Sequence, residues 1–356
     1  MIVIIDRYRN VYIRNHHFKR KVYLITSLSE ENMSEKGIKL DVRDRRLLVE
    51  LNFDARQANA ELAKKLRLSK KGVEYKIKRL EKAGVIEGYY PVVNFPVLGY
   101  LYCRVFLKLQ YMTAEKNAEM VLFIQQHPKM HWSIWARGIY DLAIGIWVRT
   151  FTGFKDVVSE FVTVFEPFVK ESNLSLVTEL EHLRYNFLTG REDFTGFSIK
   201  ETSVKEGLDD TDLAVLEALA RNGRNSLVEL AAAAKLTAKT ISYRLRTLRE
   251  RRILLTTRAS VNHQRLGYTH YKVFFSLRSN SRQKMMELRA HLKKQPAVIY
   301  LVDDIGITDL DVEMMFRSND EFFRFLDNFQ FRFSELIRDY QYMIYTETLK
   351  VSYLPF

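Results

Sequence analysis

Two stretches of the sequence carry basic and hydroxyl side chains at the spacing of one helical face. The first of them places Ser69, Lys70, Lys71, Lys76 and Lys78 within ten residues. Ammonium groups on a helix, together with the free N–H groups at its start, are suited to binding phosphate. The whole chain has a formal charge of +13, which also favours an anionic partner such as nucleic acid or an acidic membrane surface. These residues therefore suggest anion binding.

The second stretch is a distant copy of the first. A shift of 168 residues aligns Leu40–Tyr100 with Leu208–Tyr268 without a gap, and 18 of the 61 aligned pairs are identical. The same register continues downstream, where GIYDL at 138–142 falls on GITDL at 306–310. A register of this length without a break indicates an internal duplication.

The first part of each copy is expected to be helical. Apolar residues recur at helical spacing through 40–51 and 60–66, and a third helix is expected to begin after Ser69. Thr237 is the equivalent start in the second copy, and Ser and Thr are both good N-cap residues. The predicted inward positions are Val73, Ile77, Leu80, Ile241, Leu245 and Leu248. The stretches that follow, GVIEGYYPVV and RILLTTRASV, are each expected to form a small β-hairpin, or wing.

The second part of each copy reads strand–helix–strand–strand–helix–strand, the order of a ferredoxin-like βαββαβ domain. The fold class predicted is α+β, with two tandem units that each join a winged helix-turn-helix to a ferredoxin-like domain. The polar segment 189–207 is expected to be a linker. The predicted domains are 1–39 (N-terminal extension), 40–98 and 208–266 (winged helices), and 99–188 and 267–356 (ferredoxin-like effector and assembly domains).

The N-terminal extension has no counterpart in the repeat. We predict that translation begins at Met33, so that residues 1–32 would not belong to the native protein; a basic arm that touches DNA is the alternative. The sequence has no run of the roughly 18 apolar residues needed to span a membrane. Cys103 is the one cysteine, which excludes an intrachain disulfide and a cysteine-based metal centre. A cytoplasmic location without membrane attachment is expected.

The motif LD..D..LL..L...R....ELA..L.LS...V..KI..L...GVI.GY, followed by..N...LG, resembles the leucine-responsive/asparagine-synthase regulator (Lrp/AsnC) family. The resemblance runs twice through the chain from Leu40 to Phe356. It implies a DNA-binding transcriptional regulator with a C-terminal ferredoxin-like domain that binds a small effector, such as an amino acid, and assembles oligomers. The second copy departs from the motif where Arg252 replaces Gly84 and where Thr256-Thr257 replaces Gly88-Tyr89.

By this resemblance, the third helix of each copy is the recognition helix that enters the major groove of double-stranded DNA. The predicted DNA-binding residues are Ser69, Lys70, Lys71, Glu74, Tyr75, Lys76, Lys78, Thr237, Lys239, Thr240, Ser242, Tyr243, Arg244 and Arg246. The outward residues differ between the two helices, so we expect them to read different base sequences rather than a perfect palindrome. A winged helix that binds protein is an alternative.

The resemblance also places an effector site near the GxxD turn of each copy. The candidate residues are Gly138, Tyr140, Asp141, Gly306, Thr308 and Asp309. A purely structural turn, with the aspartate capping backbone N–H groups, is the alternative. The two ferredoxin-like domains are expected to self-associate, either within one chain as a pseudo-dimer or between chains as a homo-oligomer.

An enzymatic role is considered and not favoured. Siroheme decarboxylases share the two-domain plan and act on a tetrapyrrole, but their Tyr-Asn-Leu-Trp stretch and paired arginine in the wing are missing here. Motifs of the types GxxxxGK[ST] and HExxH are absent from the sequence. His127 and His131 lack a third ligand at useful spacing. We therefore predict no enzyme activity, no cofactor and no metal site.

Overall fold

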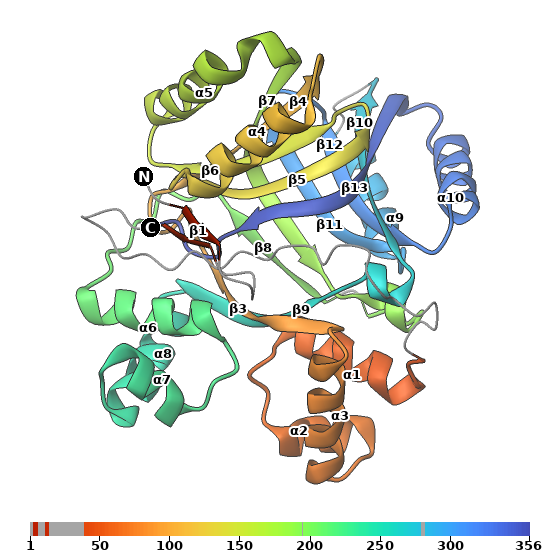
Figure 1. The fold of residues 1–356 in the computed structure, drawn as a ribbon. Coiled ribbons are helices and arrows are strands. Elements are labelled where there is room, and N and C mark those ends of the chain that lie inside the picture. Colours follow the sequence, from red (N-terminus) through yellow and green to blue (C-terminus); the bar gives the residue numbers. More distant parts are fainter. Residues whose placement is uncertain (1–2, 6–10, 14–38, 194, 279–281) are drawn as a thin grey trace.

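The computed structural model describes residues 3–5, 11–13, 39–193, 195–278 and 282–356. Figure 1 shows a β-structure at one end of the molecule and two groups of helices at the other. Of the N-terminal extension, two short strands are described, β1 (Val3–Ile5) and β2 (Val11–Ile13), which pair with each other. The predicted start at Met33 and the alternative of a basic arm fall outside the described residues.

The duplication can be followed element by element, because all ten elements of the second copy begin 168 residues after their counterparts. The first copy contains α1 (Val42–Phe53), α2 (Asn59–Leu66), α3 (Lys70–Lys82), β3 (Ile86–Val93), β4 (Leu101–Leu109), α4 (Ala114–Gln126), β5 (Met130–Gly138), β6 (Leu142–Val148), α5 (Phe151–Phe165) and β7 (Val169–Leu183). The second contains α6 (Asp210–Arg221), α7 (Leu227–Ala234), α8 (Ala238–Glu250), β9 (Leu254–Val261), β10 (Thr269–Leu277), α9 (Arg282–Lys293), β11 (Val298–Ile305), β12 (Leu310–Phe316), α10 (Asn319–Arg332) and β13 (Ile337–Val351).

Two helical units, α1–α3 (unit 1) and α6–α8 (unit 2), form around apolar stripes. The six positions predicted to face inward on the third helices are all buried, from Val73 to Leu80 in unit 1 and from Ile241 to Leu248 in unit 2. Asp41 caps α1 through a reciprocal capping box with Asp44, which satisfies free N–H groups at the helix start. The helical prediction for the start of each copy is confirmed.

The prediction of a hairpin wing within each copy is wrong. Each stretch forms one strand, and β3 pairs antiparallel with β9 of the other copy, with Tyr89 opposite Ala259 and Tyr90 opposite Arg258. Contacts between the copies continue into the turn after α1, where the Ala55 N–H donates to the Thr257 carbonyl (2.6 Å). Alternating apolar residues predict a strand but do not identify its partner, and the nearest candidate in sequence was the wrong one.

The remaining long strands close into a barrel. Its order is β4–β7–β11–β12–β10–β13–β5–β6 and back to β4, with every neighbouring pair antiparallel. Half 1 of the barrel (β4–β7) and half 2 (β10–β13) repeat one strand order, and they meet at two seams, β7–β11 and β5–β13. The mixed α/β architecture is confirmed, but the two halves share one closed sheet instead of forming two separate sandwiches. The halves therefore pair within the chain.

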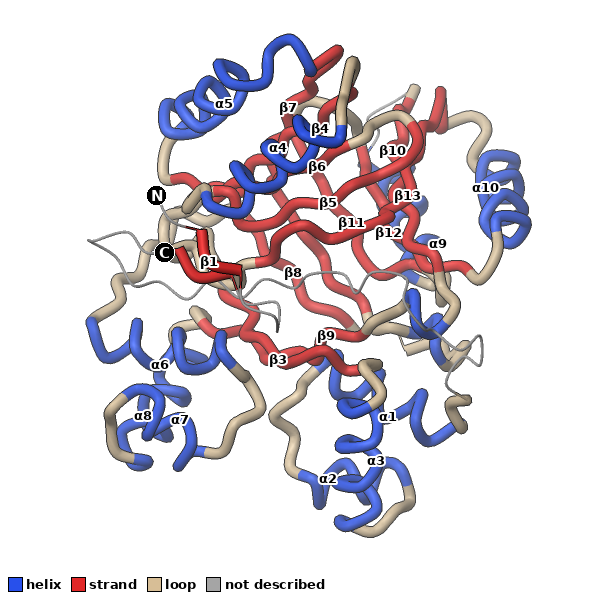
Figure 2. Tube along the Cα trace, in the orientation of Figure 1, coloured by secondary structure: helices blue, strands red, loops and turns tan. Residues whose placement is uncertain are grey.

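Helices cover the outside of the barrel, as Figure 2 shows for α4, α5 and α10. Val105 and Ile144 of half 1 pack against Phe161 of α5, and Val273 and Val312 of half 2 lie in the cluster that includes residues of α9 and α10. The opposite side chains of these strands point into the barrel, in keeping with the period of two along a strand. One face of each strand thus builds an apolar core, and the other lines the interior.

The segment expected to be a linker contains strand β8 (Gly196–Lys200), which extends the sheet along β7, with Leu180 opposite Ile199. Within the described parts of the chain, none of the helices has the length and apolar character that a membrane crossing requires.

Candidate nucleic-acid interface

Helix α3 presents a basic outward face. The Ser69 hydroxyl caps its start by accepting a hydrogen bond from the Gly72 N–H (3.0 Å), and the predicted capping role is confirmed. Lys70, Lys71 and Lys78 are exposed on the side opposite the buried stripe. A helix start and three ammonium groups that face solvent together form a surface suited to a polyanion.

An exposed aromatic ring lies among these cations in both units. Tyr75 is 69% exposed and its counterpart Tyr243 is 54% exposed. Glu74 lies beside Tyr75 and pairs with Lys78 one turn further on (3.0 Å). Both third helices thus present a tyrosine ring to solvent at the same outward position.

Lys76 was predicted to bind DNA, but its ammonium group lies against the first helix of the unit. It contacts the carboxylates of Asp41 (2.7 Å) and Asp44 (2.9 Å), and the fully buried Asp44 also pairs with Arg79. Burial alone would lower the pKa of Lys76, but its hydrogen bonds to the two aspartates raise it, so the side chain stays charged. Through these ion pairs, Lys76 holds α3 against α1.

Helix α8 has the same cap and a different outward face. The Thr237 hydroxyl accepts from the Thr240 N–H (3.1 Å), and the two hydroxyl oxygens lie 2.8 Å apart. Lys239, Ser242 and Arg246 are exposed. The outward face of α8 therefore carries fewer ammonium groups and more hydroxyl groups than that of α3.

Arg244 repeats the inward position of Lys76. Its guanidinium contacts Asp209 (2.7 Å) and the buried Asp212 (3.1 Å), and Asp212 also binds Arg251 (3.1 Å). Of the predicted DNA-binding residues, Lys76 and Arg244 are thus engaged in ion pairs with the first helix of their own unit or its cap.

Two further cations lie at the turn before each third helix and were not predicted. Arg67 and Lys235 occupy equivalent positions, are exposed and have left-handed backbone angles (φ 53° and 56°). Each stands directly before the Leu-Ser or Leu-Thr pair that starts the next helix. This repeated cation in the sequence was the signal that could have identified them.

Reciprocal arginine contacts join the two helical units. Arg56 donates from Nη1 to the carbonyls of Gly223 (2.7 Å) and Asn225 (2.8 Å). Its counterpart Arg224 donates to the Ala55 carbonyl and, from Nη2, to the Asn59 side chain (2.6 Å). The identity of these two arginines was visible in the sequence repeat, but their role was not. They hold unit 1 and unit 2 together at the turns after α1 and α6.

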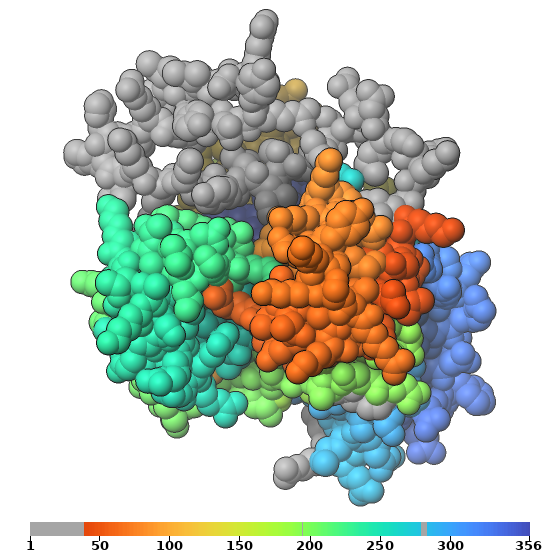
Figure 3. Space-filling view, turned by 90° about the horizontal axis from the view of Figure 1, so that it is seen from below, coloured from red at the N-terminus to blue at the C-terminus, as the bar shows by residue number. Residues whose placement is uncertain are grey.

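The two units lie beside each other on one face of the molecule, as Figure 3 shows. The β3–β9 ribbon runs between them and the barrel in Figure 1. Its register and the reciprocal arginines determine the relative position of α3 and α8. A DNA duplex read by both helices would therefore meet them at a defined spacing.

The predicted effector residues lie in the turns between β5 and β6 and between β11 and β12. One oxygen of Asp141 accepts from the Leu109 N–H (2.9 Å) and the other pairs with Lys108 (3.0 Å). Asp309 accepts from the Leu277 N–H (2.7 Å). Each aspartate thus binds the neighbouring strand, as the alternative of a structural turn predicts.

The other residues of these turns face the barrel or the seams. Tyr140 is buried against Phe106 and Phe274, and Thr308 donates to the Phe275 carbonyl (2.6 Å). Gly138 and Gly306 have positive φ angles of 130° and 134°. A Cβ atom at either glycine would lie within 2.5 Å of a carbonyl oxygen of the opposite half, so both glycines allow close approach at the seams.

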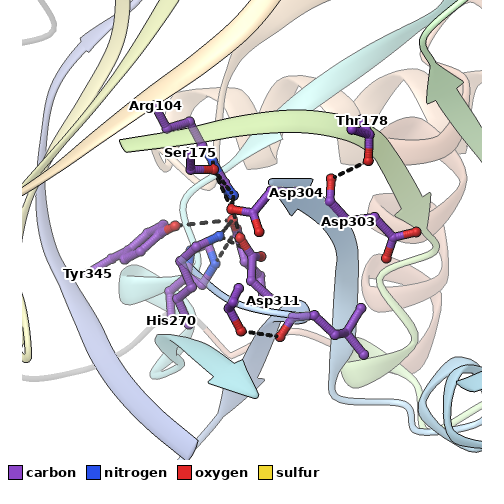
Figure 4. Close-up of polar contacts among 12 residues, drawn as sticks. Arg104, Ser175, Thr178, His270, Asp303, Asp304, Asp311 and Tyr345 are labelled. Atoms are coloured by element: carbon purple, nitrogen blue, oxygen red, sulfur yellow. Dashed lines mark hydrogen bonds and ion pairs between the residues drawn. The ribbon is translucent and has the colours of Figure 1, made fainter. Parts of the chain in front are cut away.

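The barrel interior holds a cluster of charged side chains, shown in Figure 4. Arg104 contacts Asp304 (2.7 Å) and Asp311 (2.6 Å), and Lys272 contacts Asp311 (2.7 Å) and Glu313 (3.0 Å). Burial alone would raise the pKa of Glu313, but Lys272 and a bond from His270 hold it well below its usual range. Burial raises the pKa of Asp304. The alternation of residues along each strand does not predict that these polar positions face each other across the barrel.

The two histidines weighed as a metal pair lie in different surroundings. The His127 ring is 3.0 Å from a Glu160 carboxylate oxygen, and the buried His131 ring stacks on Trp147 with centroids 3.5 Å apart. Burial holds the pKa of His131 well below its ordinary value. Among the residues that the structure describes, three or more metal-ligating side chains do not gather at any one place.

Sequence comparisons agree with the two helical units. The family described as winged helix-turn-helix DNA-binding matches residues 40–87 and again residues 208–254. The HTH-type transcriptional regulator FL11 of Pyrococcus furiosus is 30% identical over 34% of this chain and 78% of its own length. The leucine-responsive regulatory protein of Rhizobium meliloti is 30% identical over 36% of this chain and 83% of its own length. Each relative thus corresponds to one copy of the repeat.

A solved structure shares the fold over most of the chain. The siroheme decarboxylase NirDL, in complex with an iron-uroporphyrin III analogue, has a TM-score of 0.58 and covers 89% of this chain and 94% of its own. Because the sequence identity is 13%, this likeness shows the fold alone. The relatives matched in sequence, most of whose length the chain covers, decide the family. The chain belongs to the Lrp/AsnC family of transcriptional regulators, with the family's winged helix present twice.

Proposed function

We propose that this chain binds double-stranded DNA through α3 and α8 together and regulates transcription at those sites. The observation that carries the proposal is the pair of winged helix-turn-helix units held side by side by Arg56 and Arg224. Each unit exposes basic side chains at the start and along the outward face of its third helix. One polypeptide would thereby supply the two recognition helices that a regulator of this type otherwise obtains by dimerising.

The two helices are proposed to read unlike half-sites. Lys70 corresponds to Ala238, and Glu74 corresponds to Ser242, so the donors and acceptors near the helix start differ. Side chains at these positions select bases through hydrogen bonds to base edges, whereas the shared basic character supplies affinity without sequence preference. We therefore expect an asymmetric operator whose half-site spacing is set by the contacts between the units.

A triple substitution, Lys70→Ala with Lys71→Ala and Lys78→Ala, tests the assignment of α3. The operator is first selected from a random duplex library with the unaltered protein, and affinity is then measured across a salt series. Loss of up to three phosphate contacts should reduce the salt slope by about 1 for each lysine and weaken binding about 100-fold or more at moderate salt. The exposed pair of Lys78 with Glu74 contributes little to folding, so the variant should stay folded.

The matched control removes the same number of exposed ammonium groups from a barrel strand and from the helical segments that cover the barrel: Lys155→Ala, Lys170→Ala and Lys294→Ala. This control variant should bind the selected duplex with nearly the same dependence of affinity on salt concentration as the unaltered protein. If both triple variants bind alike, α3 does not contact DNA and the proposal fails for unit 1.

Unit 2 is tested by its own pair of changes, Lys239→Ala and Arg246→Ala. In a nuclease footprint of the operator, protection should then be lost on one half-site and kept on the other, because the two units contact separate stretches of the duplex. Loss of protection across both half-sites would mean that the two helices do not read separate sequences.

Finer features of the two halves of the barrel are also proposed. The repeated strand order supports the inference that each half derives from a ferredoxin-like βαββαβ unit, with domain boundaries at 40–98, 99–188, 208–266 and 267–356. An amino-acid effector near the GxxD turns is a further proposal, supported by the family and tested by calorimetric titration with amino acids. A location in the cytoplasm follows from the proposed access to DNA.

An enzyme that acts on a tetrapyrrole is the alternative function. It predicts a shift in the visible absorbance of an iron porphyrin when the purified protein is added. The regulator predicts no shift under conditions in which the selected duplex is bound. A saturable shift would reopen the enzymatic alternative without removing the DNA contacts.

A further inference from the structure

The charged side chains inside the barrel are shared unequally between its halves. Half 1 contributes Arg104, whereas half 2 contributes Lys272, Asp304, Asp311 and Glu313. Arg104 is 3% exposed, and Lys272 and Asp311 are not exposed at all. Figure 4 shows Arg104 reaching from its strand toward carboxylates of the other half. The cluster is thus an interface between the halves as well as part of the interior.

The repeat shows which positions carry this inequality. In half 1, the positions equivalent to the three acids of half 2 are Ala136, Ala143 and Gly145, although Arg104 is equivalent to Lys272. Half 1 therefore carries a buried cation without the matching carboxylates. Half 2 carries one buried lysine and three carboxylates, of which Asp311 accepts from the cations of both halves.

The unlike pairing comes nearest to balancing these charges. In the structure, two cations meet three carboxylates, and the third carboxylate also bonds to His270 (2.9 Å). Two copies of half 1 would bury two arginines with alanine and glycine at the acidic positions. Two copies of half 2 would bury two lysines with six carboxylates. Because an uncompensated buried charge costs several kcal/mol, both like pairings are strongly disfavoured.

The two seams between the halves also differ in charge, since one has ion pairs and the other has apolar contacts. At the β7–β11 seam, Glu181 of half 1 contacts Arg289 (3.0 Å) and Lys293 (2.7 Å) of half 2, and Arg289 also pairs with Asp303. The two contacts of Glu181 cross from one half to the other at this seam.

At the β5–β13 seam, the four equivalent positions are Val121, Gln125, Trp135 and Leu349. Val121, Trp135 and Leu349 lie in one apolar cluster, and Gln125 donates to the Leu349 carbonyl (3.3 Å). In a pair of like halves, both seams would place charged groups such as Glu181 against apolar ones such as Trp135. The residues at the seams therefore also favour the pairing of half 1 with half 2, independently of the charged residues inside the barrel.

We propose that each half of the barrel accepts the unlike half and rejects a second copy of itself, and that this unequal distribution of buried charge supplies the selectivity. The fused chain would then close on itself, or exchange unlike halves, without forming the symmetric like-half dimers that its duplicated fold permits. Selectivity of this kind comes from penalising the wrong partner as much as from stabilising the right one.

Cysteine traps in the full chain distinguish the pairings, with Cys103 replaced by alanine throughout. Leu180 lies opposite Val302 at one seam, and Ile134 lies opposite Thr348 at the other. Opposed Cα atoms in antiparallel strands are about 4.5–5.5 Å apart, which suits a disulfide. Leu180→Cys with Val302→Cys reports the unlike pairing, whereas Leu180→Cys with Ile134→Cys can join only like halves of two chains.

Both traps are refolded at high protein concentration under oxidising conditions. With the native interior, the first trap should give a cross-linked monomer, and the second should give only traces of covalent dimer. The second trap is then placed in an interior in which one carboxylate has been moved, Ala143→Asp with Asp311→Ala. This change gives half 1 its own acid at the position that Asp311 holds beside Lys272, so the covalent dimer should rise about tenfold or more.

A neutral interior provides a second, independent variant: Arg104→Met, Lys272→Met, Asp304→Asn, Asp311→Asn and Glu313→Gln. Near-isosteric neutral replacements of buried charge sets are often tolerated, and here too the like-half dimer should increase. Circular dichroism identifies which variants fold, and either folded variant decides the question. Abundant like-half dimer with the native interior, or no increase in a folded variant, would overturn the proposal.

Discussion

Units 1 and 2 have helices of equal length at a constant offset, yet they are attached to the rest of the molecule by different chemistry. Unit 1 is joined to the barrel through the fully buried Arg258, which donates to Asn52 (2.7 and 2.5 Å), approaches the His182 Nδ1 atom (2.7 Å) and donates to Tyr300 (3.2 Å). Burial, and then the Arg258 charge, hold the pKa of His182 well below its ordinary value, so the neutral ring accepts this hydrogen bond.

Unit 2 has apolar and aromatic residues at the equivalent places. Tyr90 occupies the position of Arg258 and stacks on Tyr353 with centroids 4.3 Å apart, and Ala220 replaces Asn52. In a homodimer, any contact between one unit and the barrel would occur twice. In the fused chain the copies are free to diverge, so each attachment needs to work only once, provided that the backbone positions of both units are kept.

The largest effect is expected where this comparison is sharpest, at Arg258. Arg258→Met would leave the Asn52 carbonyl and side chain, His182 and Tyr300 without their buried donor. Since breaking a buried charged network from one side is costly, we expect the free energy of unfolding to fall by about 3–5 kcal/mol. Tyr90→Phe, which removes one hydroxyl at the equivalent site, should cost about 1 kcal/mol or less. Urea unfolding followed by circular dichroism measures both.

If the two substitutions cost the same, the contrast between a charged and an aromatic attachment has no energetic meaning. Should the methionine variant fail to fold, Arg258→Lys supplies an intermediate case. It retains the charge but loses the fork of donors, and should fall between the other two.

A smaller difference is expected at the buried aspartates that hold each third helix. Asp44 binds Lys76 (2.9 Å) and Arg79, and it also accepts from the Asp41 N–H (2.9 Å) in a capping box. Asp212 binds Arg244 and Arg251, and the cap of α6 is one-sided, with the Asp209 side chain accepting from the Asp212 N–H (2.8 Å). Asp44→Ala should cost about 3 kcal/mol and Asp212→Ala about 2, because the first also removes a helix cap.

Thermal unfolding of each variant beside the unaltered chain provides the comparison. A larger loss for Asp212→Ala would mean that Arg251, which has no counterpart in unit 1, contributes more than the cap. The relative size of the two losses in stability therefore shows which buried aspartate holds its third helix more strongly.

The sequence predicted the elements of the fold better than their pairings. The 168-residue register, the caps at Ser69 and Thr237 and the inward faces of the third helices all follow from local patterns, and the structure agrees with them. The exchange of β3 and β9 and the closure of the barrel depend on partners distant in sequence, which a period of two cannot specify. The family resemblance predicts that Lys76 contacts DNA, and no local pattern in the sequence indicates its ion pair with Asp44 of α1.

The smallest expected effect concerns the turn after each third helix, α3 and α8, where the two copies share a backbone conformation and differ in residue. Gly84 and Arg252 both adopt left-handed angles, with φ of 65° and 55°. Such an angle is cheap for glycine and costs other residues about 1 kcal/mol, so Arg252→Gly should raise the free energy of unfolding by about 0.5–1 kcal/mol. The reverse change, Gly84→Arg, should cost more than this gain, because a Cβ atom there would lie 3.3 Å from the Arg265 Nε. Equal and opposite effects at the two sites would mean that backbone angle alone distinguishes them, whereas an excess loss at Gly84 assigns the remainder to the crowding by Arg265.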